Sequence, residues 1–199
     1  MSGPIGEGAL DTLFRKARTY SKFQDREVRE DVLRKIWDLA VLGPTSANTL
    51  PMRVVFVKSR EAKERLKPAL APGNLDKTMA APVTAIIAMD TQFHEHVPRL
   101  FPHNPKFGEL FMQPGKEEFT RNHIMRNASL QGGYFILAAR ALGLDVGPMS
   151  GFDNAKVDAE FFPDGRWKSN FLCNIGYGDG STLHPRLPRL SFEEACRIE

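Results

Sequence analysis

The chain has 199 residues, of which 42% are hydrophobic and 26% charged, and its formal net charge is +3. This length suits one domain with a full-sized core, and the composition is that of a folded globular protein rather than a disordered one. Because basic and acidic residues alternate along the chain, we expect no surface dedicated to nucleic acid.

Cysteines and histidines give little support for metal or dithiol chemistry. Cys173 and Cys196 lie apart in the sequence and neither belongs to a CxxC motif, and isolated thiols fit a reducing compartment. The pair His94-x-His96 is more simply explained as surface or lid residues than as metal ligands. No apolar run reaches the ~18–20 residues needed to cross a membrane, and the N-terminal residues lack the pattern of a signal peptide. We therefore expect a cytoplasmic protein without a metal or a membrane partner.

Hydrophobic spacing predicts helices that alternate with strands. In the clearest helix, Leu33, Ile36, Trp37, Ala40 and Val41 form one buried stripe, which ends at Gly43-Pro44. Further helices are predicted over residues 10–18, 60–70, 74–80 and 121–142, from the capping residue Asp153 to about 161, and near the end of 183–199. Strands are predicted over residues 53–58, 83–89 and 168–177. This alternation, without hairpin signals, indicates one domain with an α/β layered fold.

Three segments have a composition that bears on their role. Residues 83–89 are nearly all apolar, as is typical of a central strand covered on both faces. Residues 91–119 lose periodicity and are rich in proline and glycine, so we interpret them as a lid or insert. In the helix 121–142, Gly132 and Gly133 permit a close approach of another backbone. The partner of that approach is either a second subunit or the core of the same chain.

Two polar loops that follow helices predict a bound cofactor. The first is Gly43-Pro44-Thr45-Ser46-Ala47-Asn48-Thr49-Leu50-Pro51 and the second is Gly147-Pro148-Met149-Ser150-Gly151. Hydroxyls, a side-chain amide and free backbone N–H groups are suited to gripping the polar edge of a flat heteroaromatic ring. The sequence contains no GxGxxG after a strand, no P-loop and no GxSxG motif, so the usual dinucleotide, phosphate-loop and hydrolase signatures are missing.

Basic residues gather near both ends of the chain. Arg15, Lys16, Arg18 and Lys22 lie early, and Arg186 and Arg189 lie late. They are either solvated surface residues or, if the two groups converge, a phosphate clamp built on the multi-donor guanidinium. Asn74 and Lys77 add an amide and an ammonium on one short helix.

These motifs, in this order, resemble the FMN-dependent nitroreductase family from about residue 10 to the end of the chain. The likeness is closest in residues 43–48, 73–78, 141–153 and 174–179 and in the tail 186–194. Within the family, the chain is most similar to the branch that reduces malonic semialdehyde to 3-hydroxypropionate in the Rut route of uracil degradation. The resemblance implies an α+β fold with a central mixed sheet flanked by helices, an intertwined homodimer with FMN at each interface, and NADPH or NADH as the hydride donor.

The resemblance also implies a role for individual residues in binding FMN. Phosphate-binding positions are matched by Arg18, Thr19, Ser21, Lys22, Arg186 and Arg189. Positions at the edges of the flavin ring are matched by Thr45, Ser46, Asn48, Asn74, Lys77, Pro148, Met149, Ser150 and Gly151. The backbone N–H groups of Ser150 and Gly151 are expected near flavin N5, which carries the hydride. No catalytic side chain is indicated.

The chain departs from the family pattern at two places. Ala17 stands where many members have arginine, and Thr49-Leu50-Pro51-Met52 replaces a glutamine followed by Pro-Trp. We interpret the chain as an oxidoreductase acting on a small aldehyde, with Arg53, Arg99 or Arg121 as the candidate for binding a substrate carboxylate. A broad nitroreductase or quinone reductase, and a flavin-binding module with little turnover, remain as alternatives.

Overall fold

A computed structural model describes residues 3–199. Its centre is a four-stranded sheet in the order β1-β2-β4-β3, formed by β1 Met52–Val57, β2 Val83–Asp90, β4 Trp167–Gly176 and β3 Asp145–Met149. Every neighbouring pair of these strands is antiparallel. β2 and β3 run in the same direction, but β4 lies between them. The expectation of a mixed sheet is therefore wrong for these four strands. The described residues show a parallel pairing at an isolated bridge, between Thr19 and Val146.

Strand β2 is buried on both faces, as its apolar sequence predicts. Val83, Ala85 and Ile87 belong to one core cluster, whereas Ile86 and Ala88 belong to another. Successive side chains of a strand point to opposite faces, so the two clusters lie on opposite sides of the sheet. Helices must cover both faces to exclude water from them.

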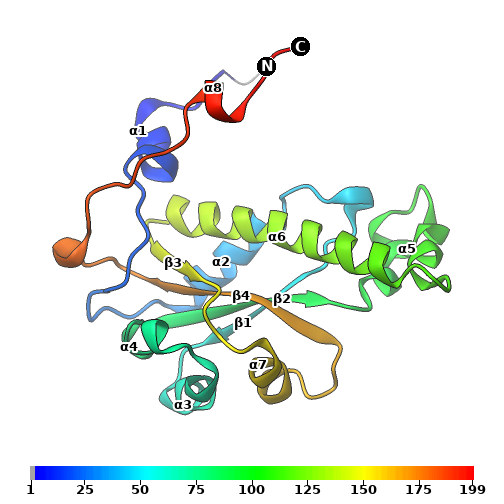
Figure 1. Ribbon diagram of the computed structural model, residues 1–199, viewed down its shortest axis with the longest axis horizontal. Coiled ribbons are helices and arrows are strands. Elements are labelled where there is room, and N and C mark those ends of the chain that lie inside the picture. Colours follow the sequence, from blue (N-terminus) through cyan, green and yellow to red (C-terminus); the bar gives the residue numbers. More distant parts are fainter. Residues whose placement is uncertain (1–2) are drawn as a thin grey trace.

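Two helices cover the first face. The long helix α6, Glu117–Ala141, runs across the sheet beside α2, Glu30–Ala40 (Figure 1). A Cβ on Gly132 would lie 2.7 Å from the ring of Phe171 in β4, so this glycine serves the core of the same chain. Gly133 faces open space. The small residues of α6 thus serve the chain's own core at Gly132, and a partner contact on this helix stays a prediction.

The second face is covered by three shorter helices. They are α3 Arg60–Leu66, α4 Pro72–Ala80 and α7 Asn154–Phe161. The predicted cap of α7 is confirmed, because the Asp153 carboxylate accepts the N–H of Lys156 at 3.1 Å. The predicted helix 60–70 is shorter than expected: α3 ends at Leu66, and Pro68 then forms a 3₁₀ turn, Lys67–Ala69.

Residues 91–119 are ordered into short helices, contrary to the loss of periodicity in their sequence. They form the 3₁₀ segment Phe93–His96, α5 Val97–Leu100 and the 3₁₀ segment Pro105–Met112. Phe93 and Phe111 lie with ring centroids 4.8 Å apart and pack with Ile124 of α6. Aromatic packing, which has no fixed period, holds this segment together.

The two terminal segments lie side by side and project from the sheet (Figure 1). The first contains α1 Glu7–Leu10 and a π-helical turn, Asp11–Arg15, in place of the single helix predicted over residues 10–18. The last contains the 3₁₀ turn Gly180–Thr182 and α8 Phe192–Ala195. Among the helices of residues 3–199, none combines the length and apolar character that a membrane crossing requires.

Candidate functional site

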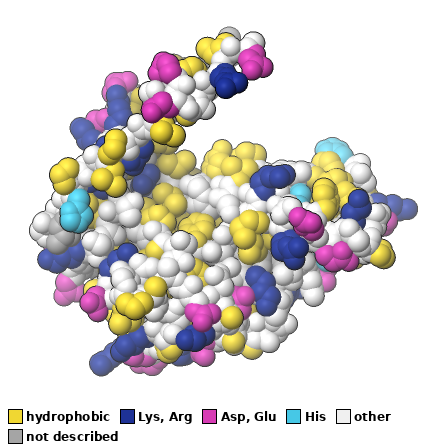
Figure 2. Space-filling model, viewed as in Figure 1, with side chains coloured by type: hydrophobic (Ala, Val, Ile, Leu, Met, Phe, Trp, Pro, Cys, Tyr) yellow, Lys and Arg dark blue, Asp and Glu magenta, His cyan; other side chains and the backbone are white. Residues whose placement is uncertain are grey.

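A basic cavity of about 430 Å³ lies where the two terminal segments meet the body of the chain. Figure 2 shows Lys and Arg side chains gathered at the base of these projecting segments. Five residues of the predicted phosphate site line it, namely Arg18, Thr19, Ser21, Arg186 and Arg189. The remaining lining residues are Phe14, Ala17, Arg140, Leu183, His184, Pro185 and Leu187. The structure therefore brings together the two basic clusters that lie at opposite ends of the sequence.

Backbone carbonyls hold the arginines of this cavity in place. Arg18 donates to the carbonyl of His184, and Arg186 Nη2 donates to the carbonyls of Arg15 at 2.7 Å and Ala17 at 2.8 Å. Among the described residues, no carboxylate forms an ion pair with any of the four lining arginines. Their charges are left for an anion to neutralise.

Lys22 does not join the basic cavity. Its ammonium lies 3.0 Å from a carboxylate oxygen of Asp179 and is exposed. Of the six residues predicted to hold a phosphate, Lys22 is the one that is not among the lining residues of this cavity, and its charge is paired with Asp179.

A second group of predicted residues meets at α4. The Asn74 amide donates to the carbonyl of Gly151 at 2.7 Å, and the N–H of Ala71 donates to the same oxygen at 3.1 Å. A Cβ at position 151 would lie 2.4 Å from the Asn74 amide nitrogen, so a larger residue there would displace this amide from its present position. Among the described residues, the N–H groups of Ser150 and Gly151 have no acceptor. Lys77, on the same helix, is half-buried.

The segment preceding Ser150 is a strand, and the prediction of a loop over 147–151 is wrong for its first half. Gly147, Pro148 and Met149 pair with Asn174, Cys173 and Leu172 of β4. Proline lacks an N–H, but β3 lies at the edge of the sheet, where a missing donor is tolerated. The residue types that indicated a loop are those that an edge strand also accepts.

A buried lysine lies behind α4. Lys63, which is 4% exposed, donates to the carbonyl of Thr78 at 2.7 Å and to the Thr84 hydroxyl at 2.6 Å. The Thr84 hydroxyl donates to Asn174 Oδ1 at 2.7 Å, and the Asn174 amide reaches the carbonyl of Lys77 at 3.3 Å. Burial lowers the pKa of the Lys63 ammonium to about 8. This network binds α4, and with it Asn74 and Lys77, to the sheet. No sequence motif had indicated Lys63.

The first polar loop, residues 45–50, has a constrained backbone. Ala47, Asn48 and Leu50 have φ values of 49°, 51° and 43°, which are uncommon for residues other than glycine. Such strain persists only where neighbouring groups fix it, and it is frequent at functional sites.

Helix α6 and the insert fix the conformation of this loop. Asn127 of α6 accepts the N–H of Ser46 at 2.8 Å, and Asn48 donates to the carbonyl of Leu100 at 2.8 Å. The Thr49 hydroxyl donates to the carbonyl of Ser46, so His123 Nε2, which lies 3.0 Å from this hydroxyl oxygen, is the donor to it. Burial lowers the pKa of His123, which favours this neutral ring.

Within one chain the two predicted ring-edge segments are not brought together. The loop 45–50 is bound to α6 on one side of the sheet, whereas Asn74 and Gly151 lie with α4 on the other. Among the described residues, no hydrogen bond joins the loop to α4 or to Ser150 and Gly151. The prediction that these segments meet at one site therefore fails for a single chain.

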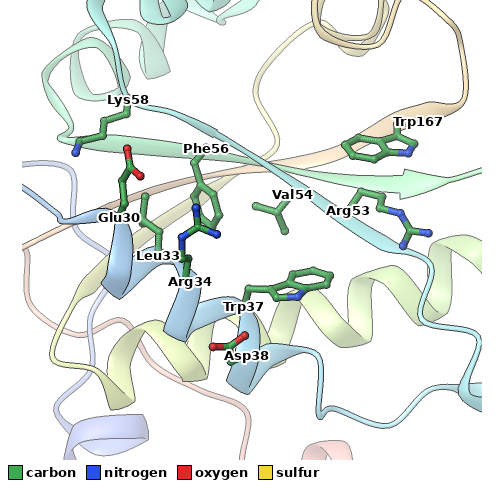
Figure 3. A pocket seen from close by; sticks show the side chains of 10 residues that line it. All are labelled: Glu30, Leu33, Arg34, Trp37, Asp38, Arg53, Val54, Phe56, Lys58 and Trp167. Atoms are coloured by element: carbon green, nitrogen blue, oxygen red, sulfur yellow. The ribbon is translucent and has the colours of Figure 1, made fainter. Parts of the chain in front are cut away.

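A second cavity, of about 640 Å³, lies elsewhere, between α2 and the edge strand β1. Figure 3 shows Trp37, Leu33, Val54 and Phe56 pointing toward one another across it. Arg53, a candidate for binding a substrate carboxylate, lies at one end. Its guanidinium is 2.6 Å from the buried carboxylate of Asp90, which Arg166 also contacts at 3.1 Å, so Arg53 is already engaged in an ion-pair cluster. Arg99 and Arg121, the other two candidates, are exposed.

Comparison with known proteins identifies the family. The sequence matches the nitroreductase family over residues 14–177. The chain belongs to the nitroreductase family. Two relatives carry the provisional name NADH dehydrogenase/NAD(P)H nitroreductase: a protein of Stenotrophomonas maltophilia (strain K279a) is 58% identical, and one of Rhodopseudomonas palustris (strain TIE-1) is 54% identical, each over 198 residues and 100% of both chains.

Solved structures share the fold at low sequence identity. The nitroreductase ydfN of Bacillus subtilis, also provisionally named, aligns with a TM-score of 0.88 at 23% identity and covers 98% of this chain and 100% of its own. A provisionally named nitroreductase of Exiguobacterium sibiricum, solved in complex with FMN, aligns with a TM-score of 0.78 at 16% identity over 100% of both chains. At these identities the likeness concerns the fold.

The buried Lys63 predicts a pH dependence of stability. In the unfolded chain, lysine keeps its proton up to about pH 10.4, whereas folded Lys63 releases it at about pH 8. Between these values the unfolded state binds more protons, so the free energy of unfolding rises with pH, by up to about 3 kcal/mol in total. Relative to Lys63→Met, the wild-type protein should gain stability between pH 8 and pH 10, as measured by urea unfolding. Parallel curves for the two proteins over this range would contradict the assignment.

Proposed function

We propose that this chain is an FMN-dependent NAD(P)H oxidoreductase. The observation that carries the proposal is the basic cavity, in which four arginines face one space of about 430 Å³ and have no carboxylate partner within residues 3–199. A phosphate group fits such a site because guanidinium groups bind its oxygens with several N–H donors. The unmatched N–H groups of Ser150 and Gly151 fit the polar atoms of a flavin ring.

Bound FMN would supply hydride chemistry, taking hydride from a nicotinamide donor and passing it to a second substrate. The chain's own residues position and polarise the cofactor. Arg18, Arg186 and Arg189, with Thr19 and Ser21, hold the phosphate. Asn74 and Lys77 donate toward the pyrimidine edge, and their position depends on the Lys63 network behind α4. Pro148 and Met149, paired in β3, fix the backbone that presents the N–H groups of Ser150 and Gly151.

We propose further that the active form is an intertwined homodimer. The loop 45–50, with Thr45, Ser46 and Asn48, lies across the sheet from α4, so a second copy would have to supply it to the flavin held by the first. We assign the contact between the two copies to the C-terminal residues 187–198, which leave large apolar side chains exposed, namely Leu187, Leu190, Phe192 and Ile198. The apolar cavity beside the free edge of β1 fits such a segment of a partner.

For the second substrate we propose malonic semialdehyde, and residues 91–119 would act as a lid over it. The support is the likeness of the motifs to the semialdehyde-reducing branch of the family. Because Arg53 is already bound to Asp90, Arg99 and Arg121 remain as candidates for the substrate carboxylate. The names of the relatives favour a second candidate, a broad nitroreductase, which would use the same cofactor site.

The purified protein should be yellow and should oxidise NADPH or NADH with an acceptor. Comparison of kcat/KM for malonic semialdehyde, a quinone and a nitroarene separates the two candidate functions, because this ratio reports differential binding of the transition state. Replacing the arginine that binds the carboxylate should raise KM for the semialdehyde while sparing uncharged acceptors. A colourless protein that binds no added FMN would refute the flavin assignment itself.

Lys77→Ala should lower the midpoint potential of the bound flavin. An ammonium near the ring stabilises the negative charge that the ring gains on reduction, so removing it disfavours the reduced state. Spectroelectrochemical titration measures this potential. Lys67→Ala removes an exposed lysine paired with Glu64 at 3.3 Å and serves as the control. Equal potentials in the Lys77 variant and the wild type would exclude this role.

The wild-type protein should have the mass of a dimer of 22.3-kDa chains in light scattering. Replacing Leu190 and Phe192 by Glu should raise the dimer dissociation constant and, in parallel, weaken FMN binding, since each site would lose the partner's loop. Glu193→Gln is the control, because it changes a residue of the same short helix α8 but leaves the exposed apolar side chains intact. A monomer with unchanged affinity for FMN would rule out a shared site.

A further inference from the structure

Arg140 differs from the other arginines of the basic cavity in its place in the fold. It belongs to the last turn of α6, which packs on the sheet, whereas Arg18, Arg186 and Arg189 belong to the projecting terminal segments. Its Nη1 donates to the carbonyl of Leu13 at 3.1 Å, which joins the N-terminal segment to α6. No sequence motif indicated this residue.

The guanidinium of Arg140 has a buried donor without an acceptor. Its Nε is shielded from solvent and has no hydrogen-bond partner among the described residues. A buried donor without an acceptor destabilises the fold, and more so when the group is charged, so such an atom calls for an explanation. Arg140 also lines the cavity and has no ion-pair partner among the described residues, so an anion bound there would provide the opposite charge to its guanidinium.

The surrounding groups do not neutralise Arg140. Asp145 is a carboxylate whose charge acts on Arg140 electrostatically. It accepts the N–H of Gly178 at 2.9 Å and forms no ion pair with Arg140. The other arginines already donate to carbonyls: Arg18 to His184, Arg186 to Arg15 and Ala17, and Arg189 to Leu187 and Pro188. Ala17 lines the same cavity without adding a charge.

We propose that Arg140 binds the phosphate of the flavin directly and fixes it to α6. This inference rests on the proposed function and adds to it a residue that determines specificity for the phosphorylated flavin. The rigid helix holds the phosphate from the core side, and the arginines of the terminal segments close over it from outside. The phosphate thus connects the two terminal segments to the body of the chain.

The test compares the affinity of the apoprotein for FMN and for riboflavin, which differ only in the phosphate. Flavin fluorescence quenching gives both dissociation constants. Arg140→Met should weaken FMN binding by about tenfold or more, as expected for the loss of a charge-assisted hydrogen bond, and leave riboflavin binding unchanged. Arg60→Met removes an exposed arginine of α3 that is remote from the cavity, and it should preserve the wild-type ratio of the two constants.

Two outcomes overturn the inference while leaving the proposed function intact. Either Arg140→Met keeps the wild-type preference for FMN over riboflavin, or it weakens both flavins equally, as a purely structural role would predict. If thermal unfolding shows that the Met variant does not fold, Arg140→Gln, which keeps an N–H donor but no charge, decides the question by the same ratio. A wild-type protein that binds neither flavin refutes the proposed function instead.

Discussion

Burial of the central strands on both faces is the constraint from which the rest of the structure follows. Val83, Ala85 and Ile87 of β2 face one core, and Ile86 and Ala88 face the other, so one layer of helices cannot cover the sheet. The long helix α6 and its neighbour α2 cover the first face, and α3, α4 and α7 cover the second. This division separates the two polar segments of the candidate site, because the loop 45–50 belongs to the α6 side and Asn74 and Gly151 to the α4 side. A shared site then requires a second copy of the chain.

The positive charges of the site are held in two different ways. The arginines of the basic cavity are positioned by backbone carbonyls, which orient a guanidinium without neutralising it. Lys63 is buried without a carboxylate partner among the described residues, and two oxygen acceptors compensate part of the cost of its burial. Both arrangements leave net positive charge close to where an anionic cofactor is proposed to bind. A flavin phosphate would gain from this field, because it would neutralise arginines that have no carboxylate partner among the described residues.

The same contacts that order the loop 45–50 also hold its backbone in strained conformations. Three of its residues adopt positive φ values, and Asn127, His123 and the carbonyl of Leu100 hold it in that conformation. His123 also stacks on Phe93 of the insert, with ring centroids 5.2 Å apart. The insert 91–119 and the loop 45–50 are therefore parts of one packed unit.

The sequence by itself determined most of the helices and strands. The apolar pattern predicted α2, β1, β2, α6 and β4, because a helical stripe or a short apolar run is a local property of the chain. The motifs predicted the arginines at the two ends of the chain as phosphate-binding candidates, whereas the hydrogen bond between Asn74 and Gly151 was visible only in the structure. Tertiary structure alone decided that β3 is a strand, since Gly147 and Pro148 pair with β4 only because they lie at a sheet edge. It also decided that Lys22 pairs with Asp179, that Arg53 pairs with Asp90, that Arg140 lines the basic cavity and that Lys63 is bound behind α4. These contacts join residues that are distant in the sequence. The local spacing of apolar residues cannot predict them, because it does not show which distant segments pack together.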